Sequence, residues 1–492
     1  MSESTRPPRS RTPQSKAFQD YMTTGWARPE GAAPTTRPVA EYAAARRGRL
    51  LDGLPESLQG KTLLIPAGPA VRRANDTDYP YRPHSAFVYL TGWGSETTPG
   101  SLLVMDTETT DTTVYLRGPA PRDSDEFYAN PAIGEFWTGP RASVADVGQE
   151  LGLETKDLSQ WSGISDQDLP HTVILPDADD VLSWDTGHRR MALGTAEDLQ
   201  EADRELARVL SEARFVKDEY EIAELREAIA STHRGFDDIV RALPGATEVA
   251  RGERVIEGVF AARARLEGND VGYGTIAAAG SHACTLHWVS NHGNIHSGEL
   301  LLVDAGVERE SLYTADITRT FPVSGVFSDT QREVYDAVLE AADAALAAVQ
   351  PGVSFRTLHD EAMRVIARHT ASWGLLPGTA EESLSAEAGW HRRFMIHGTG
   401  HHLGLDVHDC QQARREVYQD QELQPGMVFT IEPGLYFQPD DLSVPDHLRG
   451  IGIRIEDNIL VTKTGAEVLS AAIPRTASEV EAWMSAAHHT GD

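Results

Sequence analysis

Cysteine, long apolar runs and positive charge are what this sequence has least of. Of its 492 residues only 2 are cysteines, which excludes a disulfide framework and suits the reducing cytoplasm, where we expect the protein. No apolar run reaches the roughly 18 residues of a membrane-spanning helix, so we expect no membrane partner. The basic first residues are not followed by the apolar stretch of a secretory signal. A formal net charge of −30 argues against nucleic acid or an anionic membrane as partner.

The length predicts two domains with short flanking segments. Residues 1–38 are rich in Pro, Thr, Ser and Arg and are expected to form a flexible arm. A domain over 39–205 and a second over 206–475 follow, and 476–492 is expected to be a C-terminal tail. Strands in the first domain are predicted at 61–67, 85–90, 101–106, 112–117 and 171–176, with helices at 144–151 and after 195, which indicates an α/β domain. A helical pattern over 201–242 joins the halves, and the second half is expected to contain a strand at 271–279 and helices at 329–349 and 354–373.

The segment Leu300–Pro322 (LLLVDAGVERESLYTADITRTFP) contains two acidic residues in strand-like surroundings. Asp304 ends an apolar run, and Asp316 lies 12 residues later on the expected partner strand. Buried carboxylates brought together across a hairpin repel each other unless they share a proton or a metal ion. The alternative is a pair of salt-bridged aspartates, helped by Arg319.

Histidines and further acids follow. The segment Phe394–Asp409 (FMIHGTGHHLGLDVHD) contains four histidines among glycines that favour a tight loop over a helix. Glu432 ends the apolar run VFTIEPG, and in the expected strand 450–461 (GIGIRIEDNILV) alternation places Arg454 and Glu456 on one face. Carboxylates beside so many apolar strands are better explained by divalent cations than by separate salt bridges. Oxygen-rich ligation with one imidazole favours manganese, cobalt or iron(II) over structural zinc.

Several motifs together resemble the metallopeptidases of the pita-bread fold, and among them the Xaa-Pro aminopeptidases (aminopeptidase P). The motifs are VDAG (303–306), ADITRTFPVSGVF (315–327), HGTGHHLGLDVHD (397–409), TIEPGLY (430–436) and GIGIRIED (450–457), with VRRANDTDYPYRPHSAFVYLTGW (71–93) in the first domain. The resemblance spans roughly residues 36–475. It implies a creatinase/aminopeptidase P-like α/β N-terminal domain followed by an α+β pita-bread catalytic domain.

The resemblance also implies a site of two divalent metal ions and the residues around it. Its ligands would be Asp304, Asp316, His401, Glu432 and Glu456, with Asp316 and Glu456 bridging both ions. His401 is preferred over His402 because it stands four residues after His397, in the family's spacing. His287, His397 and His408 would surround substrate, and Arg454 would support the ligands. Manganese is the first expectation, with cobalt, iron(II) or zinc as alternatives.

The expected activity is removal of the N-terminal residue from peptides with proline in second position. A metal-bridged hydroxide would attack the peptide carbonyl, Glu432 would act as general base, and His408 would help to stabilise the tetrahedral intermediate. Relatives of this kind are homodimers or homotetramers, which we expect here as well. The alternatives are an Xaa-Pro dipeptidase (prolidase) and a non-catalytic peptide-binding module on the same scaffold. Cys410 is interpreted as a small buried thiol and not as a nucleophile.

Overall fold

The computed structural model describes residues 15–27, 34–75 and 77–489. The chain divides into two compact units, residues 1–207 and 208–492. The domain boundaries expected from the sequence stay predictions.

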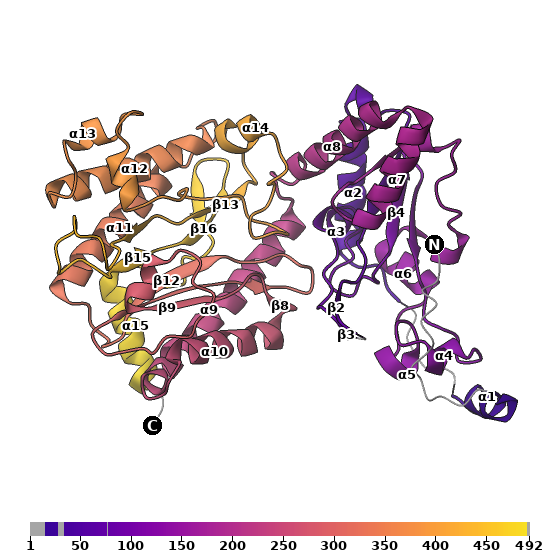
Figure 1. The fold of residues 1–492 in the computed structure, drawn as a ribbon, viewed down its shortest axis with the longest axis horizontal. Coiled ribbons are helices and arrows are strands. Elements are labelled where there is room, and N and C mark those ends of the chain that lie inside the picture. The colour runs from indigo at the N-terminus through magenta and orange to yellow at the C-terminus, as the bar shows by residue number, and fades with distance from the viewer. Residues whose placement is uncertain (1–14, 28–33, 76, 490–492) are drawn as a thin grey trace. The chain divides into compact units, whose positions relative to one another are not determined.

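The first unit is built on a five-stranded sheet with the strand order β6-β5-β4-β1-β7 (Figure 1). The strands are β1 Thr62–Pro66, β4 Leu102–Asp106, β5 Thr112–Leu116, β6 Glu154–Asp157 and β7 Thr172–Ile174. Antiparallel pairs β1–β4 and β4–β5 form the centre, and β7 and β6 join parallel to β1 and β5 at the edges. Its main helices are α2 Val39–Asp52, α3 Ser85–Thr91, α6 Val144–Leu151 and α7 Asp180–Leu193. The α/β class expected for this half is confirmed.

The predicted strand at 85–90 is wrong, because residues Ser85–Thr91 form helix α3. All seven residues of α3 are buried. The helix therefore has no exposed polar face that would show a 3.6-residue period, and its sequence is equally typical of a buried strand. The helix ends are set locally. The His84 side chain accepts a hydrogen bond from the Ala86 N–H, and Gly92 ends the helix with φ +72°.

Part of the segment expected to be a flexible arm has defined structure. Residues Lys16–Met22 form helix α1. The Phe18 ring meets Tyr128 edge-on at 5.6 Å, and Trp26 meets Phe127 at 5.2 Å. These aromatic side chains supply the apolar surface that composition alone did not suggest. The rest of the expected arm, residues 1–14 and 28–33, lies outside the described residues.

The second unit places short sheets between long helices (Figure 1). One sheet has the order β12-β10-β9 and another the order β13-β16-β17, while β14 pairs with β15 and β11 with β8. The strands are β8 Asp270–Val271, β9 Ile276–Ala279, β10 Leu300–Ala305, β11 Val307–Glu308, β12 Ile317–Pro322, β13 Val428–Ile431, β14 Gly434–Tyr436, β15 Gly452–Arg454, β16 Asp457–Val461 and β17 Ala466–Val468. The helices are α9 Glu219–Thr247, α10 Gly252–Glu267, α11 Asp329–Ala347, α12 Phe355–Ser372 and α15 Ala477–His489, with short α14 at Arg415–Asp420.

The structure divides some of the predicted elements. The helical pattern over 201–242 is interrupted between α8 (Ala196–Glu212) and α9, and the predicted strand 271–279 becomes β8 and β9. The predicted strand 450–461 splits into β15 and β16, which pair with β14 and β13 respectively. Pro433 separates β13 from β14 and has no N–H for a ladder, so the facing chain also breaks, at Ile455 and Glu456.

Helix α15 occupies most of the segment expected as a C-terminal tail, 476–492. Helix α15 buries Ala477, Val480 and Met484 in the hydrophobic core of the second unit. The Trp483 Nε1–H donates to Asp237 at 2.8 Å. The apolar residues recur at helical spacing (477, 480, 484), a pattern typical of an amphipathic helix that packs on a core.

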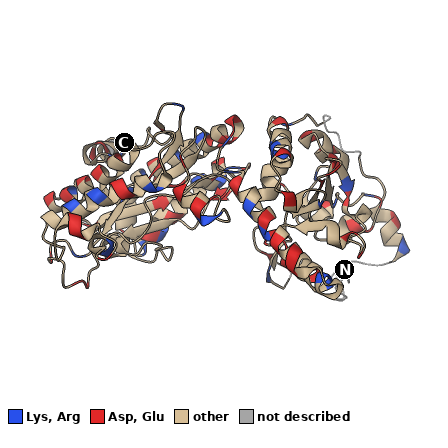
Figure 2. Cartoon of the chain, turned by 90° about the horizontal axis from the view of Figure 1, so that it is seen from above, with Lys and Arg blue, Asp and Glu red and all other residues tan. Residues whose placement is uncertain are grey.

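Figure 2 shows acidic residues along the helices of both units, with basic residues scattered among them. Among the described residues, no helix combines the length and hydrophobicity needed to cross a bilayer.

Candidate metal centre

The side chains proposed from the sequence as metal ligands or as their catalytic neighbours line one cavity of about 660 Å³ in the second unit. They come from strands and loops far apart in the chain: Asp304, Asp316, His287, His397, His401, His408, Glu432, Arg454 and Glu456. Apolar walls come from Ile276, Leu286, Val289 and Val407. The structure therefore brings the predicted residues together, while their individual roles stay predictions.

The aspartates are placed by the hairpin of β10 and β12. Asp304 lies on β10 opposite Thr318, and Asp316 immediately precedes β12. The Tyr273 hydroxyl lies 2.7 Å from Asp304 Oδ1 and 2.5 Å from Asp316 Oδ1. A hydroxyl has one proton and can donate to only one of these carboxylates. The second contact therefore requires a further proton or a cation between the two acids.

Arg454, not Arg319, neutralises the first aspartate. Its Nη2 donates to Asp304 Oδ2 at 2.6 Å, and its Nη1 donates to the Tyr436 hydroxyl at 3.1 Å. Arg319 is fully buried and donates to Asp457 Oδ1 at 2.7 Å. The interpretation of the hairpin as aspartates paired with Arg319 is therefore wrong.

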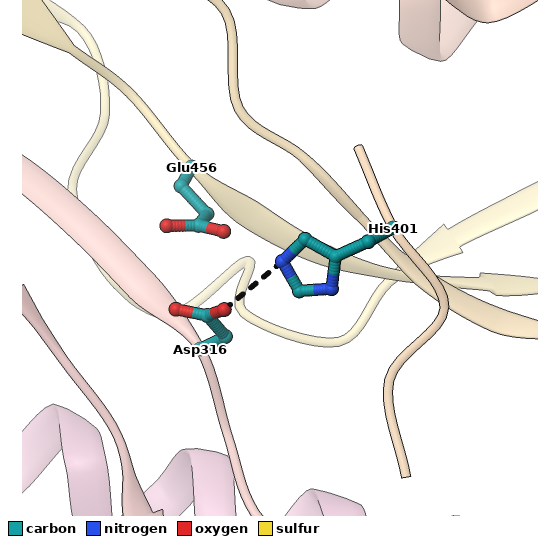
Figure 3. A group of neighbouring side chains, drawn as sticks. All are labelled: Asp316, His401 and Glu456. Carbon is teal, nitrogen blue, oxygen red and sulfur yellow. Dashed lines mark ion pairs between the residues drawn. The ribbon is translucent and has the colours of Figure 1, made fainter. Parts of the chain in front are cut away.

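Asp316, His401 and Glu456 form the tightest group (Figure 3). One ligand atom from each lies within 4.8 Å of the others, and all three residues are buried. His401 Nε2 is 3.2 Å from Asp316 Oδ2. Glu456 Oε2 accepts from the Thr318 hydroxyl at 2.7 Å, whereas its Oε1 is buried with no hydrogen-bond partner. A buried carboxylate oxygen without a partner is energetically costly, which favours a cation next to this atom.

Glu432 completes the acidic group from the end of β13. Its Oε1 lies 3.5 Å from His401 Nε2 and its Oε2 lies 3.9 Å from His397 Nδ1. Burial raises the pKa of Glu432 to about 7, against the opposing charge of His401. Burial also disfavours charge on His401, but the hydrogen bond to Asp316 and the charge of Glu432 raise its pKa to about 9. The raised pKa of His401 reflects its acidic neighbours, whereas the raised pKa of Glu432 reflects chiefly its burial.

The remaining histidines lie around this group. His397 Nε2 is 2.9 Å from the Tyr436 hydroxyl, and the His408 ring lies 4.1 Å from that of His401. Burial lowers the pKa of both His397 and His408 to about 4, with a further contribution from Arg454 for His397 and from His401 for His408. Both imidazoles are therefore neutral at pH 7 and can donate or accept hydrogen bonds.

The adjacent pair His401 and His402 is divided by the structure. His402 is fully buried and does not line the cavity. Its ring lies 4.5 Å from Phe215 and 4.7 Å from Phe355, and neither ring nitrogen has a hydrogen-bond partner. His402 is therefore an aromatic core residue.

The interpretation of Cys410 as a buried thiol agrees with its surroundings. It is fully buried and has φ +63°. Burial raises its pKa well above that of a free thiol. A thiol held in its neutral form is a poor nucleophile.

Several residues of the site were missed from the sequence. Tyr273 contacts Asp304 and Asp316, Thr318 donates to Glu456, and Tyr436 contacts Arg454 and His397. Their local sequence pattern does not indicate these contacts, although Thr318 and Tyr436 lie in the motifs ADITRTFPVSGVF and TIEPGLY.

A further missed residue, Glu253, is a buried glutamate on α10 that shapes the loop carrying His287. It accepts from the N–H groups of Ala279 and Gly293 and from Trp288 Nε1, and its Oε1 lies 2.8 Å from His282 Nδ1. A single carboxylate thus organises the loop from which His287 reaches the cavity.

The donor set fits divalent cations. Four carboxylates and one imidazole converge on the cavity, one carboxylate oxygen lacks any partner, and two acids share a single hydroxyl proton. Oxygen-rich sites with an imidazole are typical of catalytic divalent metal ions. The fold and this site define the class of metal-dependent hydrolases.

Comparisons with known proteins give the family. Residues 223–463 match the model of metallopeptidase family M24, and residues 43–171 match the aminopeptidase P N-terminal domain. The chain belongs to metallopeptidase family M24. The expected fold class, an aminopeptidase P-type N-terminal domain followed by the pita-bread catalytic domain, is confirmed.

Similar proteins cover nearly the whole chain. Xaa-Pro aminopeptidase 1 of Streptomyces coelicolor is 48% identical over 477 residues, 96% of this chain and 92% of that protein. Zinc-substituted aminopeptidase P of Escherichia coli in complex with product has a TM-score of 0.75 at 31% identity, covering 92% of this chain and 99% of that one. The same enzyme with the inhibitor Pro-Leu has a TM-score of 0.74 at 31% identity, covering 92% and 100%.

Proposed function

We propose that this protein is a metal-dependent Xaa-Pro aminopeptidase, a metallo-aminopeptidase that releases the N-terminal residue from peptides with proline in second position. The observation that carries the proposal is the convergence of Asp304, Asp316, His401, Glu432 and Glu456 on one cavity in an M24 chain. The names of its relatives, Xaa-Pro aminopeptidases that it matches over most of its length, support the same substrate class.

The proposed ligands Asp304, Asp316, His401, Glu432 and Glu456 would together hold two divalent cations. Bound there, the cations would lower the pKa of water and polarise the scissile carbonyl. We propose manganese as the native metal, with cobalt, iron(II) or zinc as alternatives. A zinc-substituted relative with product bound supports tolerance of the site for zinc.

The remaining steps belong to the side chains. Glu432, which lies beside His401 at the end of β13, would accept a proton from the attacking water and deliver it to the leaving proline nitrogen. His408 beside His401 would donate a hydrogen bond to the carbonyl oxygen as negative charge develops. Arg454 would keep Asp304 in place through their contact at 2.6 Å. His287 and His397 would flank the substrate from the cavity wall.

Proline explains the need for a dedicated enzyme. The Xaa-Pro nitrogen carries no hydrogen, so a peptidase that recognises that N–H cannot bind it productively. The apolar walls of the cavity and the Tyr436–His397 contact at 2.9 Å offer surfaces for the proline ring.

The alternative is a prolidase, which must hold the free carboxylate of a dipeptide's proline. Such recognition uses a cationic side chain in a charge-assisted hydrogen bond. Among the described residues that line the cavity, Arg454 is the only arginine or lysine, and it is already engaged by Asp304 and Tyr436. This favours an aminopeptidase that leaves the C-terminal side of the substrate open.

The test compares three substrates of the metal-loaded protein: a dipeptide Xaa-Pro, the tripeptide Xaa-Pro-Ala and its N-acetylated form. We expect kcat/KM for the tripeptide to equal or exceed that for the dipeptide, and the acetylated peptide to remain intact. Hydrolysis confined to the dipeptide would make the protein a prolidase. No hydrolysis of either free peptide, with metal bound, would favour a non-catalytic binding module.

Assembly and location complete the proposal. We propose a cytoplasmic homodimer or homotetramer without nucleic-acid or membrane partners. The two free buried cysteines support a reducing compartment, and the net charge of −30 argues against a nucleic-acid partner.

A further inference from the structure

A second pocket, of about 360 Å³, adjoins the catalytic cavity in the same unit. It is formed by the start of α12, the loop at 392–400 and helix α14, with α12 and α14 in orange in Figure 1. His397, Gly398, Gly400 and Tyr418 line both spaces. A peptide that leaves the catalytic cavity past these residues would therefore meet the second pocket. Its volume is within the roughly 300–1,000 Å³ of ordinary ligand pockets.

The two spaces have opposite charge. Aspartates and glutamates line the catalytic cavity. The residues lining the second pocket include Arg356, Arg392 and Arg415 but no carboxylate. Basic side chains are the minority in this chain, with 44 Lys and Arg against 74 Asp and Glu. Their concentration at this pocket is therefore a specific feature.

Two of these arginines keep their charge available. Arg356 is paired with Asp420 at 2.5 Å. Arg392 donates from Nη2 only to the Ile396 carbonyl, at 3.3 Å, and Arg415 donates from Nε to Gln419 Oε1 at 3.3 Å. Within the described parts of the chain, no carboxylate oxygen lies within 4.0 Å of either guanidinium, whereas the neighbouring Arg393 and Arg414 are paired with Asp441 and Glu212.

The walls between these arginines are ordered by packing. The Phe355 ring lies 5.1 Å from Phe429. His359 Nδ1 is 2.9 Å from the Thr399 hydroxyl, which ties α12 to the loop that carries His397 and His401. The pocket thus shares its framework with the catalytic loop, and its position relative to the cavity is fixed.

We propose that this pocket binds a carboxylate on the leaving-group side of the peptide substrate, through Arg392 and Arg415. The carboxylate is either the C-terminus of a short peptide or an Asp or Glu side chain beyond the proline. This inference rests on the proposed aminopeptidase function, because the free amine is then held at the acidic cavity and the rest of the peptide extends outward. Peptides with an acidic end would be preferred substrates.

The experiment uses metal-loaded full-length protein and three matched peptides: Ala-Pro-Ala-Glu-amide, Ala-Pro-Ala-Gln-amide and Ala-Pro-Ala-Gln with a free carboxylate. We expect kcat/KM for either anionic peptide to exceed that of the neutral one by about 10-fold, mainly through KM, and the preference to weaken with added salt. The two anionic peptides distinguish a side-chain carboxylate from a terminal one.

In Arg392→Gln and Arg415→Gln we expect this ratio to fall to less than about 3. The matched controls Arg393→Gln and Arg414→Gln, whose arginines are paired outside the pocket, should keep the wild-type ratio. A wild-type ratio near 1, or an unchanged ratio in both pocket variants, overturns the proposal.

A binding measurement that needs no turnover distinguishes failure of the proposed aminopeptidase function from failure of the pocket proposal. Titration calorimetry compares Pro-Ala-Glu-amide with Pro-Ala-Gln-amide on the wild type and the four variants. If no Xaa-Pro peptide is cleaved but the acidic peptide binds more tightly in an Arg392- and Arg415-dependent way, the pocket stands and the aminopeptidase function fails. Equal binding of both peptides overturns the pocket.

Discussion

The adjacent histidines 401 and 402 show how much one position changes the chemistry of a side chain. His401 faces the carboxylates of the cavity, and its pKa rises to about 9. His402 points into an aromatic cluster, where burial, followed by the charge of Lys217, lowers its pKa to about 3. His401 therefore belongs to the acidic group of the cavity, and His402 belongs to the aromatic core.

Alanine substitutions should separate these two roles. We expect His401→Ala to lose bound metal and nearly all peptidase activity. His402→Ala should keep its metal but lose about 2–4 kcal/mol of unfolding free energy, because it leaves a cavity among aromatic rings. Metal analysis and urea unfolding of both variants check this. His402→Phe is the matched control and should retain stability, because it refills the space and removes two unpartnered nitrogens. Equal metal loss in His401→Ala and His402→Ala would show that the assignment within the pair is wrong.

Glu432 is the residue whose position best suits proton transfer, because it lies between His401 and His397. We expect Glu432→Gln to lower kcat by at least about 100-fold, because the amide cannot accept the proton of the attacking water. Steady-state kinetics with metal analysis measures this, and exposed Glu416→Gln on α14 is the control. A Glu432→Gln protein with full metal content and near-normal turnover would remove Glu432 from the mechanism.

Among the elements, the loop after His401 depends on one buried acid. Asp409 is 1% exposed and accepts from Arg214 Nε at 2.9 Å and from Lys217 Nζ at 3.2 Å, both in the segment between α8 and α9. Burial alone would raise the Asp409 pKa, but these two cations outweigh it and lower the pKa below the ordinary value. The loop that carries His408 is thereby fixed to a distant part of the chain.

This pairing predicts a pH dependence of stability. Because the folded-state pKa is below the unfolded value of about 3.9, the ionised carboxylate stabilises the protein fully above that pH. The contribution is then lost as the pH falls through the lower folded-state pKa. We expect the unfolding free energy to decrease below about pH 4 in urea titrations. Asp409→Asn should cost about 3–5 kcal/mol at pH 7, because buried Lys217 loses its carboxylate and Arg214 keeps only Asp406, and should show a smaller decrease at low pH. Exposed Asp440→Asn should behave as wild type. An identical low-pH decrease in Asp409→Asn would contradict this account.

For the whole molecule, the last helix is part of the core of the catalytic unit. Helix α15 contributes Ala477, Val480 and Met484 to that core, and its Glu481 accepts from the Phe327 N–H at 2.9 Å. Helix α15, the last described element, is therefore part of the hydrophobic core of the catalytic unit.

Deletion of residues 477–492 should strongly destabilise the protein. Burial of Val480, Met484 and part of Trp483 contributes of the order of 5 kcal/mol, at about 1.5–3 kcal/mol for each large apolar side chain. That is comparable with the whole stability of a typical domain. We expect a large fall in Tm or loss of soluble protein, measured by thermal unfolding of expressed material. A deletion of residues 491–492 serves as control. Wild-type Tm after the longer deletion would show that α15 is dispensable.

The sequence by itself determined the chemistry of the site. Acidic residues at the ends of apolar runs, as at Asp304 and Glu432, are unfavourable unless a cation neutralises them, and glycine-rich spacing identifies a loop around His397 and His401. These are local properties, because they depend on neighbours within a few residues of the chain. They were sufficient to predict a carboxylate-rich metal centre and, with the motifs, the family.

Only the tertiary structure decided which residues complete that centre and where the elements end. Tyr273 meets Asp304 and Asp316 across separate strands, and Asp409 meets Arg214 nearly two hundred positions away. Helix α3 is buried on every side, so its local pattern did not distinguish a helix from a strand, and α15 packs on a core formed from the whole catalytic unit. Hydrogen bonds and burial depend on distances in space. Residues remote in sequence acquire those distances only when the chain folds.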